Sequence, residues 1–404
     1  LIVGKAVTPK TVKTSELDRF PRGNLVGIPG APERMVQSTA TDAEWTVCDA
    51  VAGTDAGVTL IAGAPYSDGP RAGELDGQHA VLVDNGTGTW LLWDGRRSPI
   101  DLADRAVTGA LGWGVNVPAA RPIATGLFNT IPEAPPLAAP AIPDAGKPAH
   151  FELPLPAPIG AVVAAYGTET PDHSTLFYAV LPDGLQPISS VLAALLRNTD
   201  SQGLDQPPRL SADVIARLPV SRALDTARYP DQRVTLVDAA HDPVTCAHWS
   251  KAAGAATSKL ALLSGSALPI ATGMHTVGLV GAGAEGTATR IALTPGSGYF
   301  TQIVGAEPTS PIEGSLYWIS DTGVRYGIDE AAGPTGKSKT VEALGLTPPA
   351  LPIPWSMLTL FAPGPALSSA DALIAHDGLA PGSPPGRTVR AALGAPPANG
   401  GETR

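Results

Sequence analysis

The stretch Trp90-Leu91-Leu92-Trp93-Asp94-Gly95, followed by Pro99-Ile100, predicts a β-hairpin that decides the architecture of the chain. An aromatic strand runs into an Asp-Gly turn, where the glycine can supply the positive φ of a tight turn, and a short second strand follows. The pattern then predicts a short helix ending near Ala110-Leu111 and a proline-bounded return at Ile131-Pro132. A unit of about 40 to 50 residues of this kind cannot bury both of its faces alone, so it must pack on a neighbour.

The same layout occurs twice more along the chain. One copy runs from Phe177-Tyr178-Ala179-Val180 to Leu218-Pro219, and another runs from Leu316-Tyr317-Trp318-Ile319 to Pro363. The distances from the turn glycine to the later proline are 37, 35 and 40 residues, and such near-constant spacing is typical of internal repeats. The positions interpreted as equivalent are the turn glycines Gly95, Gly184 and Gly323 and the later prolines Pro132, Pro219 and Pro363.

A fourth copy is expected at the amino terminus. Ile28-Pro29-Gly30-Ala31-Pro32 is similar to the late proline element, and its turn glycine would fall before residue 1, so the chain is expected to begin inside a first repeat. Segments with alternating or fully apolar strands and Gly/Ser turns lie between the repeats and predict two halves of one central β domain. The expected division is a partial first repeat (1–33), the first half of the central β domain (34–83), the second repeat (84–145), the third repeat (146–231), the second half of the central β domain (232–305), the fourth repeat (306–378) and a disordered tail (379–404).

Composition indicates a folded, loop-rich protein. Of the 404 residues, 45 are Gly and 42 are Pro, a share of turn formers that excludes a helical bundle. Apolar residues make up 43%, which is enough for a core, and the length favours several domains over one. Charged residues make up 16% and the net charge is −10. Because contacts to phosphate need clustered Lys and Arg, this acidic chain without a long basic run is expected to bind nucleic acid poorly. No stretch reaches the ~18 apolar residues of a membrane span.

The two cysteines, Cys48 and Cys246, each lie beside a Trp in an apolar setting, one in each half of the expected central domain. They predict a single disulfide across 198 residues of sequence. Two inert buried thiols are one alternative. A metal site is the other, because His241, Cys246 and His248 fall within eight residues, but a zinc site normally gathers four ligands and the sequence has no second cluster of ligands.

Two glycine-rich stretches are similar to nucleotide-binding motifs. Gly281-x-Gly283-x-x-Gly286 has dinucleotide-binding spacing, with Glu307 beyond it, but the residues before Phe300 are broken by Pro295-Gly296 and predict no helix to hold a pyrophosphate. Gly336, Lys337 and Ser338 end a phosphate-loop-like stretch in which Ala331 replaces the first glycine. We expect no apolar parallel strand to lead into this second stretch. Ordinary loops, with Ser338 as a helix cap, are therefore favoured.

The seven His residues are scattered, and neither an H-E-x-x-H nor a G-x-S-x-G motif occurs. His241-Asp242 is favoured as a surface pair over half of a catalytic triad, because adjacent residues rarely point at each other. The sequence therefore predicts no catalytic or metal-ligating residue, and Gly336, Lys337 and Ser338 are its weak candidates for phosphate binding.

Several stretches together resemble EccB, the membrane-anchored component of the actinobacterial type VII (ESX) secretion machinery. The resemblance covers almost the whole chain and rests on Gly27–Pro32, Trp45–Cys48 with Cys246–Trp249, Val180–Ile188, Pro295–Gly298 and Trp318–Gly327. It implies an elongated, β-rich α+β fold in which a central β domain carries four small repeat domains in a quasi-twofold arrangement. It also implies a transmembrane helix ahead of residue 1 and a location on the periplasmic side of the inner membrane, where oxidising conditions favour the disulfide.

The resemblance implies a structural and assembly subunit of the ESX secretion core complex, which exports proteins across the mycobacterial-type envelope. Its expected partners are the other membrane components of the complex and a second copy of itself. An ATP hydrolase is the alternative, because members of the family have been described as ATPases; no cofactor is expected otherwise, and this alternative would need ATP with Mg²⁺. A further hypothesis is cell-wall glycan binding, since repeated aromatic hairpins suit stacking on sugars. Nucleic acid is not an expected partner.

Overall fold

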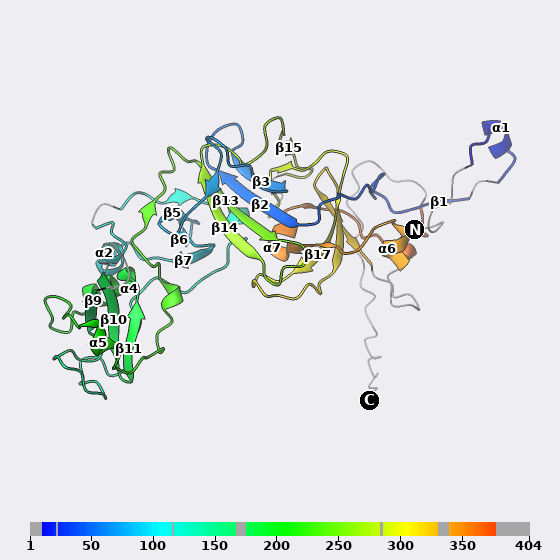
Figure 1. The fold of residues 1–404 in the computed structure, drawn as a ribbon. Coiled ribbons are helices and arrows are strands. Elements are labelled where there is room, and N and C mark those ends of the chain that lie inside the picture. Colours follow the sequence, from blue (N-terminus) through cyan, green and yellow to red (C-terminus); the bar gives the residue numbers. More distant parts are fainter. Residues whose placement is uncertain are drawn as a thin grey trace, which may run out of the picture.

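The computed structural model describes residues 10–21, 23–114, 117–166, 175–282, 286–329 and 339–376. The molecule is elongated and β-rich, with a central sheet between smaller sheets that extend toward both ends (Figure 1). Its helices are short, and α4 (Ser190–Thr199) has ten residues. Within the described ranges, no helix combines the length and the apolar character needed to cross a membrane. The expected class, an elongated β-rich α+β fold with a flanked central domain, is confirmed.

The central sheet has seven strands in the order β15-β16-β3-β2-β13-β14-β4. Strands β2 and β13 come from the two predicted halves of the central domain, and they pair antiparallel with Trp45 opposite Trp249 and Cys48 opposite Cys246. Because side chains alternate along a strand, the two Trp face one core and the two Cys face another. The strands are β2 (Ala43–Ala50), β3 (Gly57–Ala62), β4 (Gly73–Glu74), β13 (Val244–Lys251), β14 (Lys259–Gly265), β15 (Val277–Gly278) and β16 (Arg290–Ala292).

Two five-stranded sheets flank the central sheet and share one wiring. In each, three strands form an antiparallel meander, β5-β6-β7 in one sheet and β17-β18-β19 in the other. A later strand then adds in parallel to the first strand of the meander, β8 beside β5 and β20 beside β17. The strands are β5 (His79–Asp84), β6 (Thr89–Trp93), β7 (Arg96–Pro99), β8 (Arg121–Pro122), β12 (Thr235–Leu236), β17 (Tyr299–Val304), β18 (Leu316–Ile319), β19 (Val324–Ile328), β20 (Leu351–Pro354) and β21 (Ala362–Pro363).

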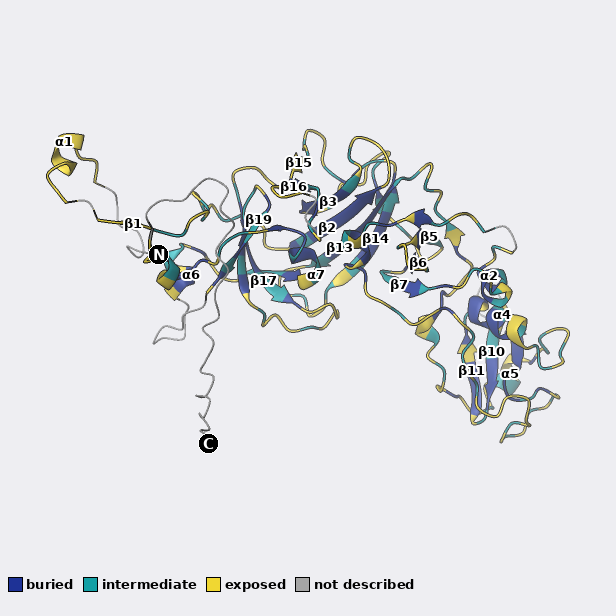
Figure 2. Ribbon diagram, turned by 180° about the vertical axis from the view of Figure 1, so that it is seen from behind, coloured by how far each residue is buried: buried dark blue, intermediate teal, exposed yellow. Residues whose placement is uncertain are grey.

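A three-stranded sheet, in the order β11-β10-β9, lies at the end of the molecule occupied by α4 and α5 (Figure 1). Helix α4 is capped by Ser189, whose hydroxyl oxygen accepts a hydrogen bond from the Leu192 amide. Its apolar face packs on α2, so the segments predicted as the second and third repeats share one core, visible as buried segments in Figure 2. The elements are β9 (Val162–Tyr166), β10 (Thr175–Leu181), β11 (Gly184–Ile188) and α2 (Arg105–Ala110).

The remaining elements are short. Ser368 caps α8 by accepting a hydrogen bond from the Asp371 amide at 2.9 Å, as the capping spacing of the sequence predicts. The remaining elements are α1 (Thr14–Leu17), α3 (Thr125–Phe128), α5 (Ala212–Ile215), η1 (Thr226–Arg228), α6 (Lys339–Ala343), α7 (Trp355–Leu358), α8 (Ser369–Ala372), β1 (Leu25–Val26) and β22 (Ala375–His376).

One core joins the central sheet to both flanking sheets. Trp45 of β2 contacts Tyr299 and Phe361 edge to face, with ring centroids 5.4 and 6.3 Å apart, and its indole nitrogen donates to the Pro352 carbonyl. Phe128, from the opposite flank, belongs to the same buried cluster. This continuous burial of aromatic and aliphatic side chains makes the long molecule a connected scaffold.

In each copy the later proline lies beside the second strand of its hairpin, but the register differs, because Arg325 pairs with Pro363 itself, whereas Arg97 and Leu185 bridge to the residues that follow Pro132 and Pro219. The Arg97 amide donates to the Pro132 carbonyl at 2.9 Å, and the Leu185 amide donates to the Pro219 carbonyl at 2.8 Å. In the last copy β21, which contains Pro363, pairs in parallel with β19. Such parallel pairing needs a long crossover, and the near-constant spacing of the sequence reflects the length of that crossover.

The turn glycines are less uniform than the sequence suggests. Gly95 and Gly323 have φ of 70° and 80°. Gly184 lies instead at the start of β11, opposite Leu181, and outside the left-handed region, so the expectation of a positive φ there is wrong. A Cβ atom at Gly184 would lie 2.5 Å from the Pro219 carbonyl oxygen, so glycine is needed for close approach of the later proline segment.

Strands β5 and β17 also differ from the predicted division. Both were expected in the central β domain, but β5 pairs with β6 and β17 pairs with β18, so each opens the meander of a flanking sheet. The short β12, also expected in the central domain, pairs in parallel with β5. Alternation of apolar residues predicts that a segment is a strand, whereas its pairing partner depends on contacts far along the chain.

Candidate interaction surface

Cys48 and Cys246 form a disulfide in the middle of the β2–β13 pair, with sulfur atoms 2.09 Å apart. Both residues are completely buried. The two alternatives therefore fail: neither cysteine is a free thiol, and the sulfur that a metal site would need is already bonded. Across the described ranges, no group of three or more His, Cys, Asp or Glu side chains is arranged to hold a metal ion.

His248, the other ligand considered for a metal, belongs to the central sheet. Its Nδ1 lies 2.9 Å from the Thr46 hydroxyl across the β2–β13 pair. Burial lowers the pKa of His248 from its ordinary 6.5 to about 4, with Glu74 raising it and Lys259 lowering it by smaller amounts. The imidazole is therefore neutral in the folded protein at pH 7.

Acidification from pH 6.5 to pH 4 should destabilise the protein through His248. The folded-state pKa lies below the unfolded one, so the unfolded chain binds more protons in this window, and the stability present above pH 6.5 is lost as the pH falls. The expected loss is up to about 3 kcal/mol at about 1.4 kcal/mol per pKa unit. Urea unfolding at pH 7 and pH 4.5 measures it. His248→Gln should flatten this pH dependence, and His241→Gln, at an exposed residue, is the matched control; parallel profiles for both variants would contradict the expectation.

The weak phosphate-binding candidates Gly336, Lys337 and Ser338 lie outside the described residues. The elements on either side are described, however, and they correct one expectation. Strand β19 ends at Ile328, shortly before the motif begins, so a strand does lead into it. That strand pairs antiparallel with β18 and in parallel with β21, and the helix after the motif, α6, has five residues. The same strand-to-helix connection joins β7 to α2 in the second repeat, so it is part of the repeat plan.

Exposed apolar side chains occur on several elements at the amino-terminal end of the molecule. Strands β1 and β22 form an isolated two-stranded antiparallel ribbon, and α1 projects beyond it, with no residue of α1 buried (Figure 1). Leu25 is 64% exposed, Leu373 63% and Phe20 70%. We call this surface the apolar end; its residues are Leu17, Phe20, Leu25, Val26, Leu373 and Ile374. A two-stranded ribbon is marginal alone in water, and clustered exposed apolar residues indicate a protein partner.

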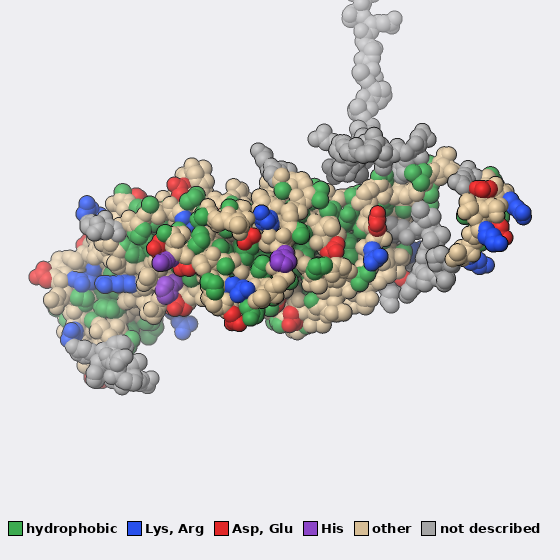
Figure 3. Space-filling model, turned by 90° about the horizontal axis from the view of Figure 1, so that it is seen from above, with side chains coloured by type: hydrophobic (Ala, Val, Ile, Leu, Met, Phe, Trp, Pro, Cys, Tyr) green, Lys and Arg blue, Asp and Glu red, His purple; other side chains and the backbone are tan. Residues whose placement is uncertain are grey.

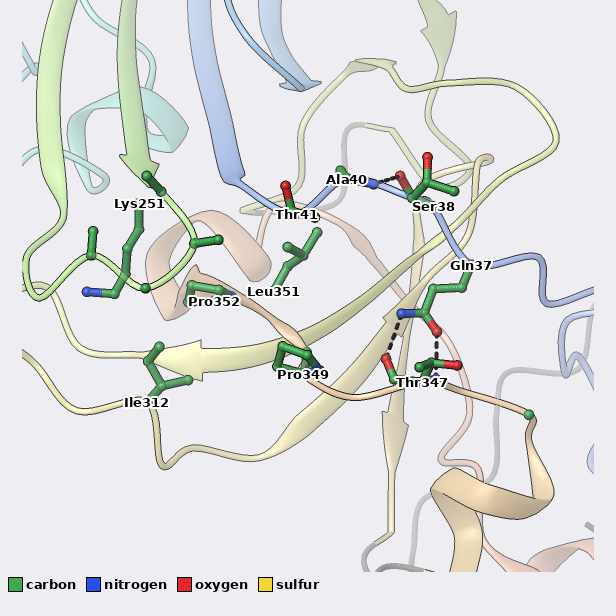
Figure 4. A pocket seen from close by; sticks show the side chains of 17 residues that line it. Gln37, Ser38, Ala40, Thr41, Lys251, Ile312, Thr347, Pro349, Leu351 and Pro352 are labelled. Atoms are coloured by element: carbon green, nitrogen blue, oxygen red, sulfur yellow. Dashed lines mark hydrogen bonds between the residues drawn. The ribbon is translucent and has the colours of Figure 1, made fainter.

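A pocket of about 640 Å³ lies between the central sheet and the neighbouring flank (Figure 4). Gln37 holds one wall in place, because its side-chain amide donates to the Thr347 carbonyl at 2.9 Å and accepts from the Thr347 amide at 2.8 Å. Ser38, Thr41 and Lys251 supply polar groups, and prolines supply apolar ones. No acid, His or Cys lines this pocket, so its described residues can bind a ligand but offer no acid–base pair.

A buried ion pair fixes the central sheet to the flanking sheet that contains β8. Arg121 of β8 donates to the Asp49 carboxylate of β2 at 2.8 Å and to the Thr245 hydroxyl of β13 at 2.6 Å. The Ala124 amide, at the start of α3, also donates to Asp49. Burial raises the pKa of the Asp49 carboxyl, while the Ala124 amide and Arg121 oppose the rise. The pair therefore couples the orientation of the flank to the central strands.

Sequence reasoning missed the apolar end and the ion pair. Leu25 and Leu373 are separated by most of the chain, and no local pattern shows that β1 and β22 meet. One signal of the apolar end was available in the sequence, since the short segments around Leu25 and Leu373 are apolar but show neither the period of a strand nor that of a helix. Asp49 follows the apolar run of β2 and, as a charged residue, is typical of a solvent-facing position.

The fold and its exposed end define the class: an elongated, repeat-built scaffold protein with a surface for assembly. The chain matches the family model described as "Type VII secretion system ESX-1, transport TM domain B" over residues 1–381, and it belongs to this family.

Relatives of known description support the membership. The chain is 64% identical over 402 residues to the ESX-3 secretion system ATPase EccB3 of Mycobacterium tuberculosis (strain H37Rv), which is 97% of this chain and 74% of that protein. It is 36% identical over 390 residues to the ESX-5 secretion system ATPase EccB5 of the same strain, covering 94% and 75% of the two chains.

Solved structures agree with the fold. A structure of the EccB3 dimer from the ESX-3 core complex superposes with a TM-score of 0.80 at 62% identity, covering 93% of this chain and 92% of the other. A structure of the periplasmic assembly from the ESX-5 inner membrane complex superposes with a TM-score of 0.76 at 35% identity, covering 94% and 89%.

Proposed function

We propose that the chain is the periplasmic structural subunit of a type VII (ESX) secretion core complex and that it acts there as a dimer. The apolar end carries the proposal, because its six large side chains need a protein partner. The likeness at 62% identity to a chain solved as a dimer favours a second copy as that partner. A location on the periplasmic side, with a transmembrane anchor outside this chain, is part of the proposal and rests on the resemblance to the EccB family.

The ESX-3 kind of complex is favoured over the ESX-2 and ESX-5 kinds. Identity to EccB3 is 64%, whereas it is 38% to EccB2 and 36% to EccB5, both from Mycobacterium tuberculosis.

Within the subunit, we infer four repeats and one central β domain with the boundaries predicted from the sequence, adjusted so that β5 opens the second repeat and β17 opens the fourth. Other membrane components of the complex would then bind to a rigid, elongated scaffold.

Charge placed on the apolar end should dissociate the dimer. We expect the purified chain to have the mass of a dimer at micromolar concentration by light scattering coupled to size-exclusion chromatography. Leu25→Asp combined with Leu373→Asp should give the monomer mass, because it would bury carboxylates without partners in the interface. Val220→Asp is the matched control, since Val220 is 71% exposed but belongs to the third repeat. A dimer that survives the double substitution with unchanged circular dichroism would refute this assignment of the interface.

ATP hydrolysis is the alternative function, because the related EccB3 and EccB5 are called ATPases. We expect the chain to hydrolyse ATP poorly or not at all, and any trace activity to survive Lys337→Ala. A working phosphate loop needs a full glycine cradle and a Mg²⁺ ion held by a carboxylate, whereas Ala331 replaces the first glycine here. Phosphate release with Mg²⁺ present measures the activity. Robust turnover that Lys337→Ala abolishes in the folded protein would instead establish the ATPase.

A further inference from the structure

A second pocket, of about 460 Å³, lies where the third repeat returns to the rest of the molecule. One wall is α4, and the other is the segment that contains Gln232 and Arg233. The pocket is remote from the apolar end, because α4 and the apolar end lie toward opposite ends of the molecule (Figure 1). Two of its lining residues, Arg197 and Arg233, carry positive charge.

The α4 wall is built from one face of the helix. Ser190, Ala193, Ala194 and Arg197 follow each other at helical spacing, so their side chains lie along one line. The two alanines leave room above the helix, and the half-buried Phe177 of β10 adds an aromatic surface. Arg197 is oriented by one hydrogen bond from its Nη2 to the Asp205 carbonyl at 2.8 Å, which leaves its other N–H groups available.

Arg233 is positioned by a glycine. The stem of Arg233 passes over Gly112, where a Cβ atom would lie 2.9 Å from the Arg233 Cδ. Neither Arg233 nor Arg197 forms an ion pair with a carboxylate in the part of the chain that the structure describes. Arg217 and Arg228 of the same repeat, by contrast, each pair with an aspartate. Two arginines therefore line this pocket whose charges are not compensated by a carboxylate within these ranges.

We propose that this pocket binds an oxyanion, a phosphate or a carboxylate, carried on an apolar body. A guanidinium is a planar fork of N–H donors that matches such anions, and two forks at one pocket can hold one anion from two sides. Ser190 and Gln232 line the same pocket and add polar groups, while Phe177 and the alanines contact the apolar body. Basic side chains gather at this end of the molecule on the face seen in Figure 3. Because the chain as a whole is acidic, attraction of the anion must be local to this site.

Calorimetric titration of the folded chain with three small probes tests the proposal. Phenyl phosphate and phenylacetate carry the two oxyanions on the same ring, and benzyl alcohol carries the ring without charge. We expect saturable binding of at least one anion, weakened by added salt, and no binding of the alcohol. Arg197→Gln and Arg233→Gln should each weaken binding about tenfold or more, since each removes a charge-assisted hydrogen bond. Arg217→Gln, whose target is an exposed ion pair elsewhere in the repeat, should leave it unchanged.

The relative affinities of the two anions indicate which kind of molecule carries the oxyanion that the pocket binds. Tighter binding of phenyl phosphate identifies a phosphoryl-bearing envelope molecule as the natural ligand, and tighter binding of phenylacetate identifies an acidic peptide. Arg233→Lys keeps the charge but loses the fork, so it should weaken binding less than Arg233→Gln does. The proposal is overturned if neither anion binds at millimolar concentration, if benzyl alcohol binds equally well, or if both glutamine variants retain full affinity with unchanged circular dichroism.

Discussion

Removal of the Cys48–Cys246 disulfide should lower the free energy of unfolding by about 5 kcal/mol. The bond joins residues 198 apart, so in the chain-entropy model it restricts the unfolded chain strongly, and the stabilisation grows with the length of the closed loop. It also connects the two strands through which both halves of the central domain meet. Guanidinium unfolding of Cys48→Ala combined with Cys246→Ala, compared with the oxidised wild type, measures the loss.

Reduced wild-type protein is the internal control for this loss, because it breaks the same bond without removing the sulfur atoms. Its unfolding curve should move in the same direction and by a similar amount as that of the double variant. Titration of the denatured, non-reduced protein should find no free thiol. Two reactive thiols per chain, or coincident unfolding curves for the oxidised and the reduced protein, would show that the bond contributes nothing.

Arg121→Leu should destabilise the protein by about 3 to 5 kcal/mol, because it leaves a buried carboxylate without its partner. The Arg121 side chain is 3% exposed and that of Asp49 is 6%, so water cannot replace the lost contact. Further acceptors would also lose their donor, since Arg121 donates to the Thr245 hydroxyl and to the Pro243 carbonyl. Urea unfolding at pH 7 measures the effect.

A double-mutant cycle isolates the pair itself. Asp49→Asn combined with Arg121→Leu removes both charges, and it should recover part of the stability that Arg121→Leu loses. Arg217→Leu is the matched control, because the Arg217–Asp213 pair is exposed and its loss should change stability little. Equal losses from Arg121→Leu and Arg217→Leu would show that burial of the Asp49–Arg121 pair does not govern its energy.

The hairpins and their repetition could be predicted because their signals are local. An Asp-Gly or Asp-Thr-Gly turn between apolar strands specifies a hairpin within about ten residues, and the recurrence of glycine and proline at similar spacing indicates that one plan is used several times. The disulfide was predictable for a related reason, since two cysteines allow a single intramolecular pairing. Ser368 as a helix cap follows from the same short-range chemistry.

Two of the copies also share an arginine contact that follows the turn glycine. Arg97 and Arg325 each follow the turn glycine by two residues, and each donates to the carbonyl of a phenylalanine, Phe128 or Phe361. Each guanidinium also lies over a tryptophan ring. The sequence shows both arginines, but the phenylalanines lie at different distances from them. Only the shared parallel crossover makes the two contacts equivalent.

The sequence by itself determined that this protein is a β-rich, repeat-built chain with a cysteine pair, because turn chemistry and the two-residue period of strands are encoded within a few neighbouring residues. Tertiary structure alone decided which sheet receives β5 and β17, why Gly184 is glycine, and where Asp49 finds Arg121. It also decided that Leu25 meets the strand after Leu373, and that Arg197 and Arg233 share one pocket. The physical reason is that these features depend on burial and contact between segments far apart in the chain, which no local period records.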